Sequence, residues 1–150
     1  MTDWSGKTVV VTGSARGIGQ AVASRFRSAG AEVFGLDRSP SSDCQRAWEL
    51  DLADPDALSR AAADIGQGRE ACHALIHCAG VCPVHPFAEA GWDSWRRTFE
   101  VNLFAAAELT RQLHPLLRAG QGSVVFVSSV SAWLPKLDQV EYAATKAAML

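Results

Sequence analysis

The sequence has no marked excess of charge of either sign and no long hydrophobic run. Its 14 lysines and arginines stand against 16 aspartates and glutamates, which gives a net charge of −2 at neutral pH. A charge this small gives no electrostatic reason to expect nucleic acid or an anionic membrane as a partner. No apolar stretch approaches the length that crosses a bilayer, and the first residues, MTDWSGK, show no basic flank before an apolar run. We therefore expect a cytoplasmic protein without a secretory signal.

Cysteine is scarce, and the four that occur do not form a zinc-binding pattern. Three of them share one short segment with three of the four histidines: Cys72, His73, His77, Cys78, Cys82 and His85. Most of this segment is an apolar run typical of a buried strand, in which neighbouring side chains point to opposite faces of a sheet. Structural zinc sites usually present paired ligands from tight C-x2-4-C knuckles rather than from a buried strand. We predict no metal site, and expect small cysteines that fill the core and stay reduced in the cytosol.

Tyrosine and lysine are also rare. The chain has one tyrosine, Tyr142, and three lysines, of which Lys146 follows the tyrosine by four positions. Residues four apart share one face of a helix, so this pair can act together. Taken alone, the pattern Y-x-x-x-K arises often by chance, and two polar residues on an alanine-rich helix are the simpler explanation. What the pair does therefore depends on the motifs around it.

The sequence does contain a steady alternation of apolar runs and helical patterns. Strands are expected at 7–12, 31–37, 46–52, 73–80 and 122–129, and helices at 18–30, 54–65, from about 92 to 117 with a break near Asn102, and from Val140 onward. Gly30 fits the residue after a helix end, and Asp54 with Pro55 fits a helix start. Strands that are apolar on both faces and separated by helices indicate a parallel sheet covered on each side. We expect one doubly wound, Rossmann-like α/β domain over residues 1–150.

The first expected strand runs into a glycine-rich turn, VVVTGSARGIG, which opens the first helix. Its glycines, Gly13, Gly17 and Gly19, are spaced G-x3-G-x-G rather than the more familiar G-x-G-x-x-G. Without Cβ atoms the backbone can approach a pyrophosphate, whose charge then lies at the N-terminus of the helix. Glycines that serve only a tight turn are the alternative. The order of strand, turn and helix favours a dinucleotide site.

An acidic residue ends the second expected strand, about 20 residues beyond the glycine turn, where dinucleotide folds carry one. Here Asp37 can accept hydrogen bonds from the hydroxyls of the adenosine ribose, and its carboxylate would repel a 2′-phosphate. Arg38 follows directly, and Arg16 lies inside the turn, where a cation can meet a phosphate. Because Asp37 stands at the discriminating position, we expect NAD as the cofactor and NADP as the less favoured one.

Taken together, these motifs resemble the short-chain dehydrogenase/reductase (SDR) family. The matching segments follow the family's order and spacing from end to end of the chain. They are TGSARGIG at Thr12–Gly19, DL at Asp51 and Leu52, CAG at Cys78–Gly80, Asn102, SS at Ser128 and Ser129, and YAATK at Tyr142–Lys146. The resemblance implies a Rossmann-like oxidoreductase that transfers a hydride between NAD(P) and a secondary alcohol or carbonyl compound.

The resemblance also implies catalytic roles for Asn102, Ser129, Tyr142 and Lys146. A free phenol has a pKa of about 10, too high for a good base at neutral pH, and a nearby cation favours the phenolate. Tyr142 would be the general acid/base, and Lys146 would supply the cation and bond the nicotinamide ribose. Ser129 would hold the substrate oxygen. Asn102 would hold a water that relays protons to the lysine, although an isolated helical asparagine is otherwise a local kink or part of a solvated face.

For the cofactor, the resemblance implies a set of residues around the glycine turn and the strand ends. They are Gly13, Ser14, Arg16, Gly17, Ile18, Gly19, Asp37, Arg38, Asp51, Leu52, Cys78, Ala79 and Gly80, together with Tyr142 and Lys146. Asp51 and Leu52 would lie on either side of the adenine ring, and Cys78–Gly80 would run along the adenosine half of the cofactor. Where the family has two asparagines before Ala-Gly, this chain has His77 and Cys78. Those asparagines mainly brace the sheet, so the change puts local rigidity in doubt rather than the reaction.

The sequence does not name the substrate. The segment 130–141 is expected to border it, with Trp133 either as an apolar wall or as a filler near a subunit contact. The segment 81–87 offers His85 or Phe87 to the same cleft. The resemblance implies a small-molecule alcohol or carbonyl substrate and a homo-oligomer, either a dimer or a tetramer.

Two other interpretations stay open. One is a dinucleotide-binding module without turnover, although the intact set of Ser129, Tyr142 and Lys146 argues against it. The other is a fragment, since family members continue with at least one further strand, a loop that contacts the nicotinamide and a substrate lid. On that interpretation the 150-residue form lacks these parts and is inactive, and its last helix is short and frayed.

Overall fold

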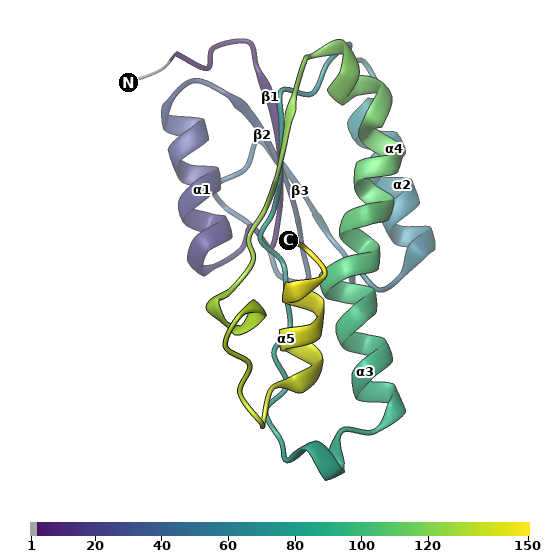
Figure 1. Cartoon of the computed structure of the whole chain (residues 1–150). Helices are drawn as coiled ribbons and strands as arrows, with labels where there is room; N and C mark the ends of the chain where they lie inside the picture. The colour runs from purple at the N-terminus through teal and green to yellow at the C-terminus, as the bar shows by residue number, and fades with distance from the viewer. Residues whose placement is uncertain (1–2) are drawn as a thin grey trace.

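The computed structural model describes residues 3–150 and has one parallel sheet at its centre (Figure 1). Its five strands lie in the order β3-β2-β1-β4-β5, and every neighbouring pair is parallel. The strands are β1 (Thr8–Thr12), β2 (Glu32–Asp37), β3 (Arg46–Glu49), β4 (Ala74–His77) and β5 (Ser123–Phe126). The predicted doubly wound, Rossmann-like α/β fold is confirmed.

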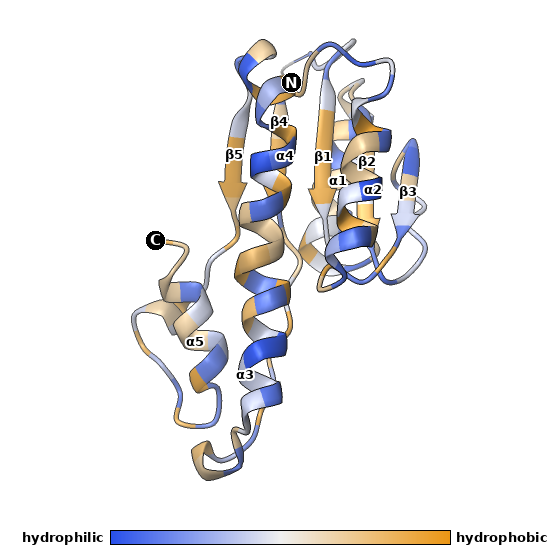
Figure 2. Ribbon diagram, turned by 90° about the vertical axis from the view of Figure 1, so that its right-hand side faces the viewer, coloured by the Kyte–Doolittle hydropathy of each residue, from blue (hydrophilic) through white to orange (hydrophobic). Residues whose placement is uncertain are grey.

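Helices cover both faces of the sheet. They are α1 (Gly17–Ser28), α2 (Pro55–Gly66), α3 (Trp92–Phe99), α4 (Ala105–Ala119) and α5 (Val140–Ala147), with the short turns η1 (Phe87–Glu89), η2 (Glu100–Phe104) and η3 (Val130–Ala132). Helix α1 lies on one face, and α2 and α4 lie together on the other (Figure 1). Helices α3 and α5 extend beyond the carboxyl ends of the strands (Figure 2). These two helices therefore flank the carboxyl edge of the sheet (Figure 2).

The central strand divides the hydrophobic core into two layers. Val10 packs with Leu58 of α2 and Leu109 of α4, whereas Val9 and Val11 belong to the layer under α1. Successive side chains of a strand point to opposite faces, so a strand covered on both sides must be apolar throughout. Figure 2 shows this hydrophobic character along β1 and β4. The continuous apolar run of the sequence follows from this double burial.

Local signals at the helix ends agree with the structure. The Asp54 side chain accepts hydrogen bonds from the backbone N–H groups of Asp56 and Ala57, each at 3.0 Å, with Pro55 in the first helical position of α2. Gly30 has a φ of +94°, the left-handed conformation that favours glycine after a helix. Both predicted helix boundaries are confirmed.

The predicted break near Asn102 is a single π-helical turn, η2, that joins α3 to α4. The three segments form one long rod that runs past the end of the sheet (Figure 1). A π-helical turn holds one extra residue and occurs often at functional sites. Here it contains Asn102, whose side chain is buried.

The third strand is shorter than predicted. It ends at Glu49, and the chain then turns because Asp51 accepts a hydrogen bond from the backbone N–H of Ala53 at 2.9 Å. The prediction of a strand over 46–52 is therefore wrong at its end. Asp51 and Leu52 lie in the loop that follows the strand, beside the carboxyl edge of the sheet.

Strand β5 is the outer strand beside β4, and it is only partly covered. Val125 is 47% exposed and Phe126 is 39% exposed, although the sequence predicted a strand buried on both faces. Within residues 3–150, no strand pairs with its outer edge (Figure 2). None of the helices in the same range has the length and apolar character needed to cross a bilayer.

Candidate functional site

A cavity of about 590 Å³ opens where β1, β2 and β4 end. The strand order reverses between β1 and β4, and ligand sites of open parallel sheets form at such a switch point. The cavity is lined by Gly13, Arg16, Gly17, Ile18, Gly19, Asp37, Arg38, Asp51, Leu52, Cys78, Ala79, Gly80, Val81, Cys82, Arg97 and Val101. Every predicted cofactor residue lines it except Ser14, Tyr142 and Lys146.

The glycine turn is packed tightly on one side and open on the other. A Cβ on Gly19 would collide with the backbone oxygen of Gly13, and a Cβ on Gly13 would lie 2.7 Å from the backbone nitrogen of Ala79. Gly17 has a φ of +56°, but a Cβ there would meet nothing within 4 Å. Two glycines thus close the turn against the end of β4, and the third leaves its outer surface free. The turn can hold a pyrophosphate against the N-terminus of α1, which fits the group that the sequence predicts.

Ser14 does not share this cavity. It is fully buried, and its Oγ would meet a Cβ placed on Gly35 of β2. Its Oγ has no hydrogen-bond partner within residues 3–150, while its backbone oxygen accepts a hydrogen bond from the Ser41 hydroxyl at 2.9 Å. The Ser14 side chain therefore packs between the glycine turn and β2. The sequence could not show this position, because it depends on how β2 packs against the turn.

Asp37 is held in place by backbone groups on both sides. Its Oδ2 accepts a hydrogen bond from the N–H of Ala15 at 3.0 Å, and its Oδ1 accepts one from the N–H of Ser39 at 3.0 Å. The bond from Ala15 ties the end of β2 to the glycine turn, and the bond from Ser39 fixes the start of the loop that follows β2. Arg16 and Arg38 line the same cavity, so a carboxylate and two arginine residues all contribute to its lining.

Arg97 is a cavity residue that the sequence reasoning missed. Its guanidinium donates a hydrogen bond to Oδ2 of Asp51 at 2.7 Å, and this bond is the main reason why the pKa of Asp51 lies below its ordinary value. The pair joins α3 to the loop after β3, across 46 positions of sequence. The only local signal was an arginine in an expected helix, which is too common to indicate a site.

Lys146 and Asn102 lie behind Gly80, which lines the cavity. A Cβ on Gly80 would lie 3.4 Å from Oδ1 of Asn102 and 3.7 Å from Nζ of Lys146. Lys146 is buried, donates a hydrogen bond to the backbone oxygen of Val127 at 2.7 Å, and has its pKa lowered by burial. Its Nζ lies 5.7 Å from the ring centroid of Tyr142. The predicted tyrosine and lysine therefore do lie together, with Lys146 next to the cavity.

The amide of Asn102 is fully engaged with protein groups. Its Oδ1 accepts a hydrogen bond from the N–H of Val81 at 2.8 Å, and its Nδ2 donates to the Val81 oxygen and to the Thr145 hydroxyl, each at 3.0 Å. Asn102 thus fixes the chain after β4 against both the π-helical turn and α5. The interpretation as a solvated helical asparagine is wrong, since the residue is 1% exposed.

The serine pair joins the end of β5 to α5. The hydroxyl of Ser128 donates to the backbone oxygen of Lys146 at 2.8 Å. Ser129 precedes η3, which packs against α5, and its Oγ accepts a hydrogen bond from the N–H of Ser131 at 3.1 Å. The hydroxyl proton of Ser129 is not used in this bond and remains able to reach another acceptor.

A second cavity, of about 820 Å³, lies between the loop after β4 and the loop before α5. His85 and Phe87 line one side of it, and Leu137 and Val140 line the other. The two predicted substrate segments therefore do meet. Trp133 is not part of this cavity, and its side chain is 73% exposed.

The cysteines and histidines are dispersed. Cys44 and Cys72 are buried as small core residues, whereas Cys82 is exposed and lines the cavity of the glycine turn. Within the part of the chain that the structure describes, all cysteines are free thiols, and no group of three or more His, Cys, Asp or Glu side chains is placed to hold a metal ion.

His77 is buried at the end of β4. Its Nε2 lies 2.9 Å from Oγ1 of Thr110, and its ring stacks on Phe126 with the centroids 4.9 Å apart. Burial lowers the pKa of His77 from 6.5 to about 4. The imidazole is therefore neutral at physiological pH and braces β4 against α4.

We expect this histidine to make the fold sensitive to acid. Between pH 6.5 and about 4 the unfolded chain binds a proton at His77 that the folded chain does not, so stability falls as the pH falls through this window. The loss amounts to about 3 kcal/mol. In His77→Asn, the difference in unfolding free energy between pH 7 and pH 4 should shrink by about this amount in urea titrations. The exposed His114→Asn is the control, and an unchanged pH dependence in His77→Asn would contradict the assignment.

Comparison with known proteins places this geometry in a family context. A family model described as short chain dehydrogenase matches residues 7–150. The chain is 33% identical over 150 residues to 2,3-dihydro-2,3-dihydroxybenzoate dehydrogenase of Escherichia coli (strain K12), covering 98% of this chain and 60% of that protein. It is 35% identical over 161 residues to L-rhamnose 1-dehydrogenase (NAD(P)(+)) of Sphingomonas sp. (strain SKA58), covering 95% of this chain and 62% of that protein. The chain thus spans about three fifths of the length of these relatives.

Solved structures give the same picture. A short chain dehydrogenase/reductase family oxidoreductase from Brucella ovis, in complex with a partially ordered NAD, superimposes with a TM-score of 0.85 at 34% identity, covering 95% of this chain and 72% of that one. A short chain dehydrogenase from Shigella flexneri gives a TM-score of 0.86 at 26% identity, covering 97% of this chain and 64% of that one.

Proposed function

The chain belongs to the short chain dehydrogenase family, and on that premise we propose that it carries the cofactor site and the acid/base residues of an enzyme that transfers a hydride between NAD(P) and a secondary alcohol or carbonyl compound. The observation that carries the proposal is the position of Lys146 and Asn102 directly behind Gly80, a residue that lines the cavity of the glycine turn. A buried cation next to the only tyrosine of the chain supplies what proton transfer needs.

The cavity residues would hold the dinucleotide in an extended form. The pyrophosphate would lie against the glycine turn and the N-terminus of α1, where backbone N–H groups and the helix dipole favour an anion. Asp37 would accept hydrogen bonds from the adenosine ribose, and the loop with Asp51 and Leu52 would enclose the adenine. When bound, the dinucleotide supplies the hydride donor or acceptor.

Tyr142 would transfer the proton that accompanies the hydride. Its hydroxyl would give a proton to a carbonyl oxygen, or its phenolate would take one from an alcohol, and Lys146 would stabilise the phenolate. Burial strengthens this effect, because the attraction between opposite charges grows as the surroundings become less polar. The hydroxyl of Ser129 would donate to the substrate oxygen. Asn102 would keep Val81 and α5 at a fixed separation around the lysine.

The cofactor preference gives a testable consequence. In Asp37→Asn the carboxylate charge is lost, so the affinity for NADP should rise relative to NAD by roughly tenfold, equivalent to about 1.4 kcal/mol. Titrations of both reduced cofactors, followed by fluorescence, measure this ratio. Asp43→Asn removes an equal charge from the loop that follows β2, does not touch the cavity and should leave the ratio unchanged. An unaltered ratio in Asp37→Asn would remove Asp37 from the discriminating role.

Binding and turnover together test the proposed function. NADH and NADPH are titrated into the chain, and NAD reduction by a panel of sugars, polyols, cyclic diols and hydroxy acids is measured with the longest natural chain that contains this sequence. We expect that the chain binds a reduced cofactor and that the longer natural chain oxidises at least one alcohol of the panel. Binding without turnover would support a non-catalytic dinucleotide module, and a failure to bind either cofactor would overturn the enzyme assignment.

A further inference from the structure

A carboxylate is completely buried next to the proposed acid/base residue. Glu141 is 0% exposed and lies in the first turn of α5, directly before Tyr142. A buried carboxylate is costly unless it is paired and hydrogen-bonded. Nothing in the proposed proton transfer uses Glu141, so its presence at this position needs a different explanation.

Glu141 is held by two donors from two other parts of the chain. Its Oε1 accepts a hydrogen bond from the hydroxyl of Ser94 on α3 at 2.7 Å, and it lies 2.9 Å from Nε2 of His85 in the loop after β4. Burial alone would raise the pKa of Glu141, but the bond from Ser94 and the pairing with His85 outweigh it and hold the pKa below its ordinary value. The group is therefore an anion at neutral pH.

The same loop is fastened to the start of α5 by its backbone. The N–H of His85 donates to the backbone oxygen of Asp138 at 3.0 Å. The loop, α3 and the start of α5 thus meet at one carboxylate. We call Glu141, Ser94 and His85 the Glu141 cluster.

The cluster fixes one end of a short helix, and Asn102 fixes the other. Glu141 and Thr145 are four residues apart and share one face of α5, where Glu141 binds Ser94 and Thr145 binds Asn102. Tyr142 and Lys146 form the adjacent face, each one residue further along. Successive residues of a helix are about 100° apart, so two anchors on the first face set the direction of the second.

We propose that Glu141 is a positioning residue, which uses Ser94 and His85 to fix the rotation of α5 and thereby the direction of the Tyr142 hydroxyl. The inference rests on the proposed function, because Tyr142 must act in proton transfer for its direction to affect turnover. A small displacement is enough, since misplacing a reacting group by about 1 Å can lower the rate by about 100-fold. Asn102 cannot replace the cluster, because it holds the helix at Thr145, a full turn away.

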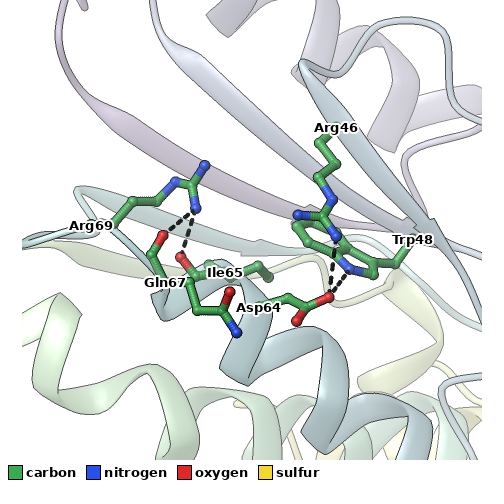
Figure 3. Close-up of polar contacts among 6 residues, drawn as sticks. All are labelled: Arg46, Trp48, Asp64, Ile65, Gln67 and Arg69. Carbon is green, nitrogen blue, oxygen red and sulfur yellow. Dashed lines mark hydrogen bonds and ion pairs between the residues drawn. The ribbon is translucent and has the colours of Figure 1, made fainter.

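Two variants of Glu141 and one control separate positioning from general stability. Glu141→Ala removes the acceptor, and Glu141→Gln keeps an oxygen for Ser94 and His85. The control is Asp64→Ala on α2, whose Oδ2 accepts from Nε1 of Trp48 at 3.0 Å and from Arg46 at 3.2 Å (Figure 3). This control also removes a carboxylate with two donors, but it lies at the opposite edge of the sheet.

In turnover assays, Glu141→Ala should lower kcat by roughly 10- to 100-fold per folded molecule, with little change in the KM for the dinucleotide. Glu141→Gln should recover most of the loss, and Asp64→Ala should leave kcat unchanged. In a Tyr142→Phe background, Glu141→Ala should cause no further loss, because Glu141 acts through the tyrosine hydroxyl. An equal loss in both backgrounds, or no loss in the first, would overturn the inference.

A second readout does not depend on turnover. Tyr142 is the only tyrosine of the chain, so tyrosine labelled with carbon-13 at the hydroxyl-bearing carbon gives one NMR signal. We expect the signal to shift or broaden in Glu141→Ala, to stay close to the wild type in Glu141→Gln, and to be unaffected in Asp64→Ala. If Glu141→Ala fails to fold, Ser94→Ala removes the hydroxyl that bonds Glu141 at 2.7 Å and lies 3.3 Å from Nε2 of His85. It leaves the pairing of His85 with Glu141 in place, so it should shift the signal by a smaller amount.

The two readouts distinguish two kinds of failure. One kind of failure is a wild type that shows no turnover, together with a signal that moves in Glu141→Ala. This result would contradict the proposed function but would support the role of Glu141 in orienting Tyr142. A wild type that turns over, together with an unmoved signal and an unchanged kcat in Glu141→Ala, would contradict the positioning role alone.

Discussion

Replacing Tyr142 by phenylalanine should lower turnover by roughly 10²- to 10⁴-fold, the usual contribution of a positioned general acid or base. The ring, its packing and the 5.7 Å separation from Lys146 remain, and only the hydroxyl is lost. Tyr142 does not line the cavity of the glycine turn, so the affinity for NADH should change little. The measurement is kcat at saturating substrate together with a fluorescence titration of NADH.

The control for this prediction removes a hydroxyl that lies elsewhere. Ser59→Ala on α2 loses an exposed hydroxyl that bonds Gln112, and it should keep full turnover. Lys146→Met should lower turnover as much as Tyr142→Phe does. The double variant should have the same turnover as either single variant, because the effects of residues that act as a unit are not additive. Full turnover in Tyr142→Phe would remove the tyrosine from the reaction, although membership of the family would stand.

Replacing Gly19 by alanine should abolish dinucleotide binding and also destabilise the fold. The new Cβ would collide with the backbone oxygen of Gly13, which cannot move without disturbing the contact between Gly13 and Ala79. Overpacking of this kind costs about 1–3 kcal/mol or more. Unfolding in urea and NADH titration at a temperature where the variant is folded give the two effects separately.

Two further glycines serve as matched comparisons for Gly19→Ala. Gly66 has nothing within 4 Å of its Cβ position and no positive φ, so Gly66→Ala should keep binding and stabilise α2 by about 0.5–1 kcal/mol. At Gly17 a Cβ would also meet free space, but φ is +56°. A residue with a side chain is strained in this conformation, so Gly17→Ala should lower the free energy of unfolding by about 1–2 kcal/mol. If Gly19→Ala binds NADH as the wild type does, the turn is not the cofactor site.

Much of the fold was predictable because its signals are local. The apolar strands, the helix start at Asp54 and Pro55, and the left-handed Gly30 each depend on a few neighbouring residues. The break at Asn102 was predictable for the same reason. The parallel arrangement of the sheet followed from the alternation of apolar strands and helices. Strand ends were less certain, as the early end of β3 shows, because a side-chain turn at Asp51 decides it.

The candidate site was predictable only in part. The glycine turn, Asp37 and the Tyr142–Lys146 pair form sequence patterns. The structure gathers the first two around one cavity, and Lys146 lies behind Gly80, which lines that cavity. The bond between Arg97 and Asp51 and the cluster around Glu141 join residues more than 40 positions apart. No local sequence pattern predicts such contacts, because arginine, glutamate and serine are common residues on the surface of a helix.

Transfer of a labelled hydride tests the central claim most directly. A secondary alcohol with deuterium on its carbinol carbon is incubated with NAD and the longest natural chain that contains this sequence, and the nicotinamide product is analysed by mass spectrometry and NMR. The proposed function predicts that deuterium appears on the nicotinamide ring at the rate of alcohol oxidation, and that Tyr142→Phe slows this transfer without weakening NAD binding. Alcohol oxidation that leaves the nicotinamide free of deuterium, or transfer that is as fast in Tyr142→Phe as in the wild type, would contradict it.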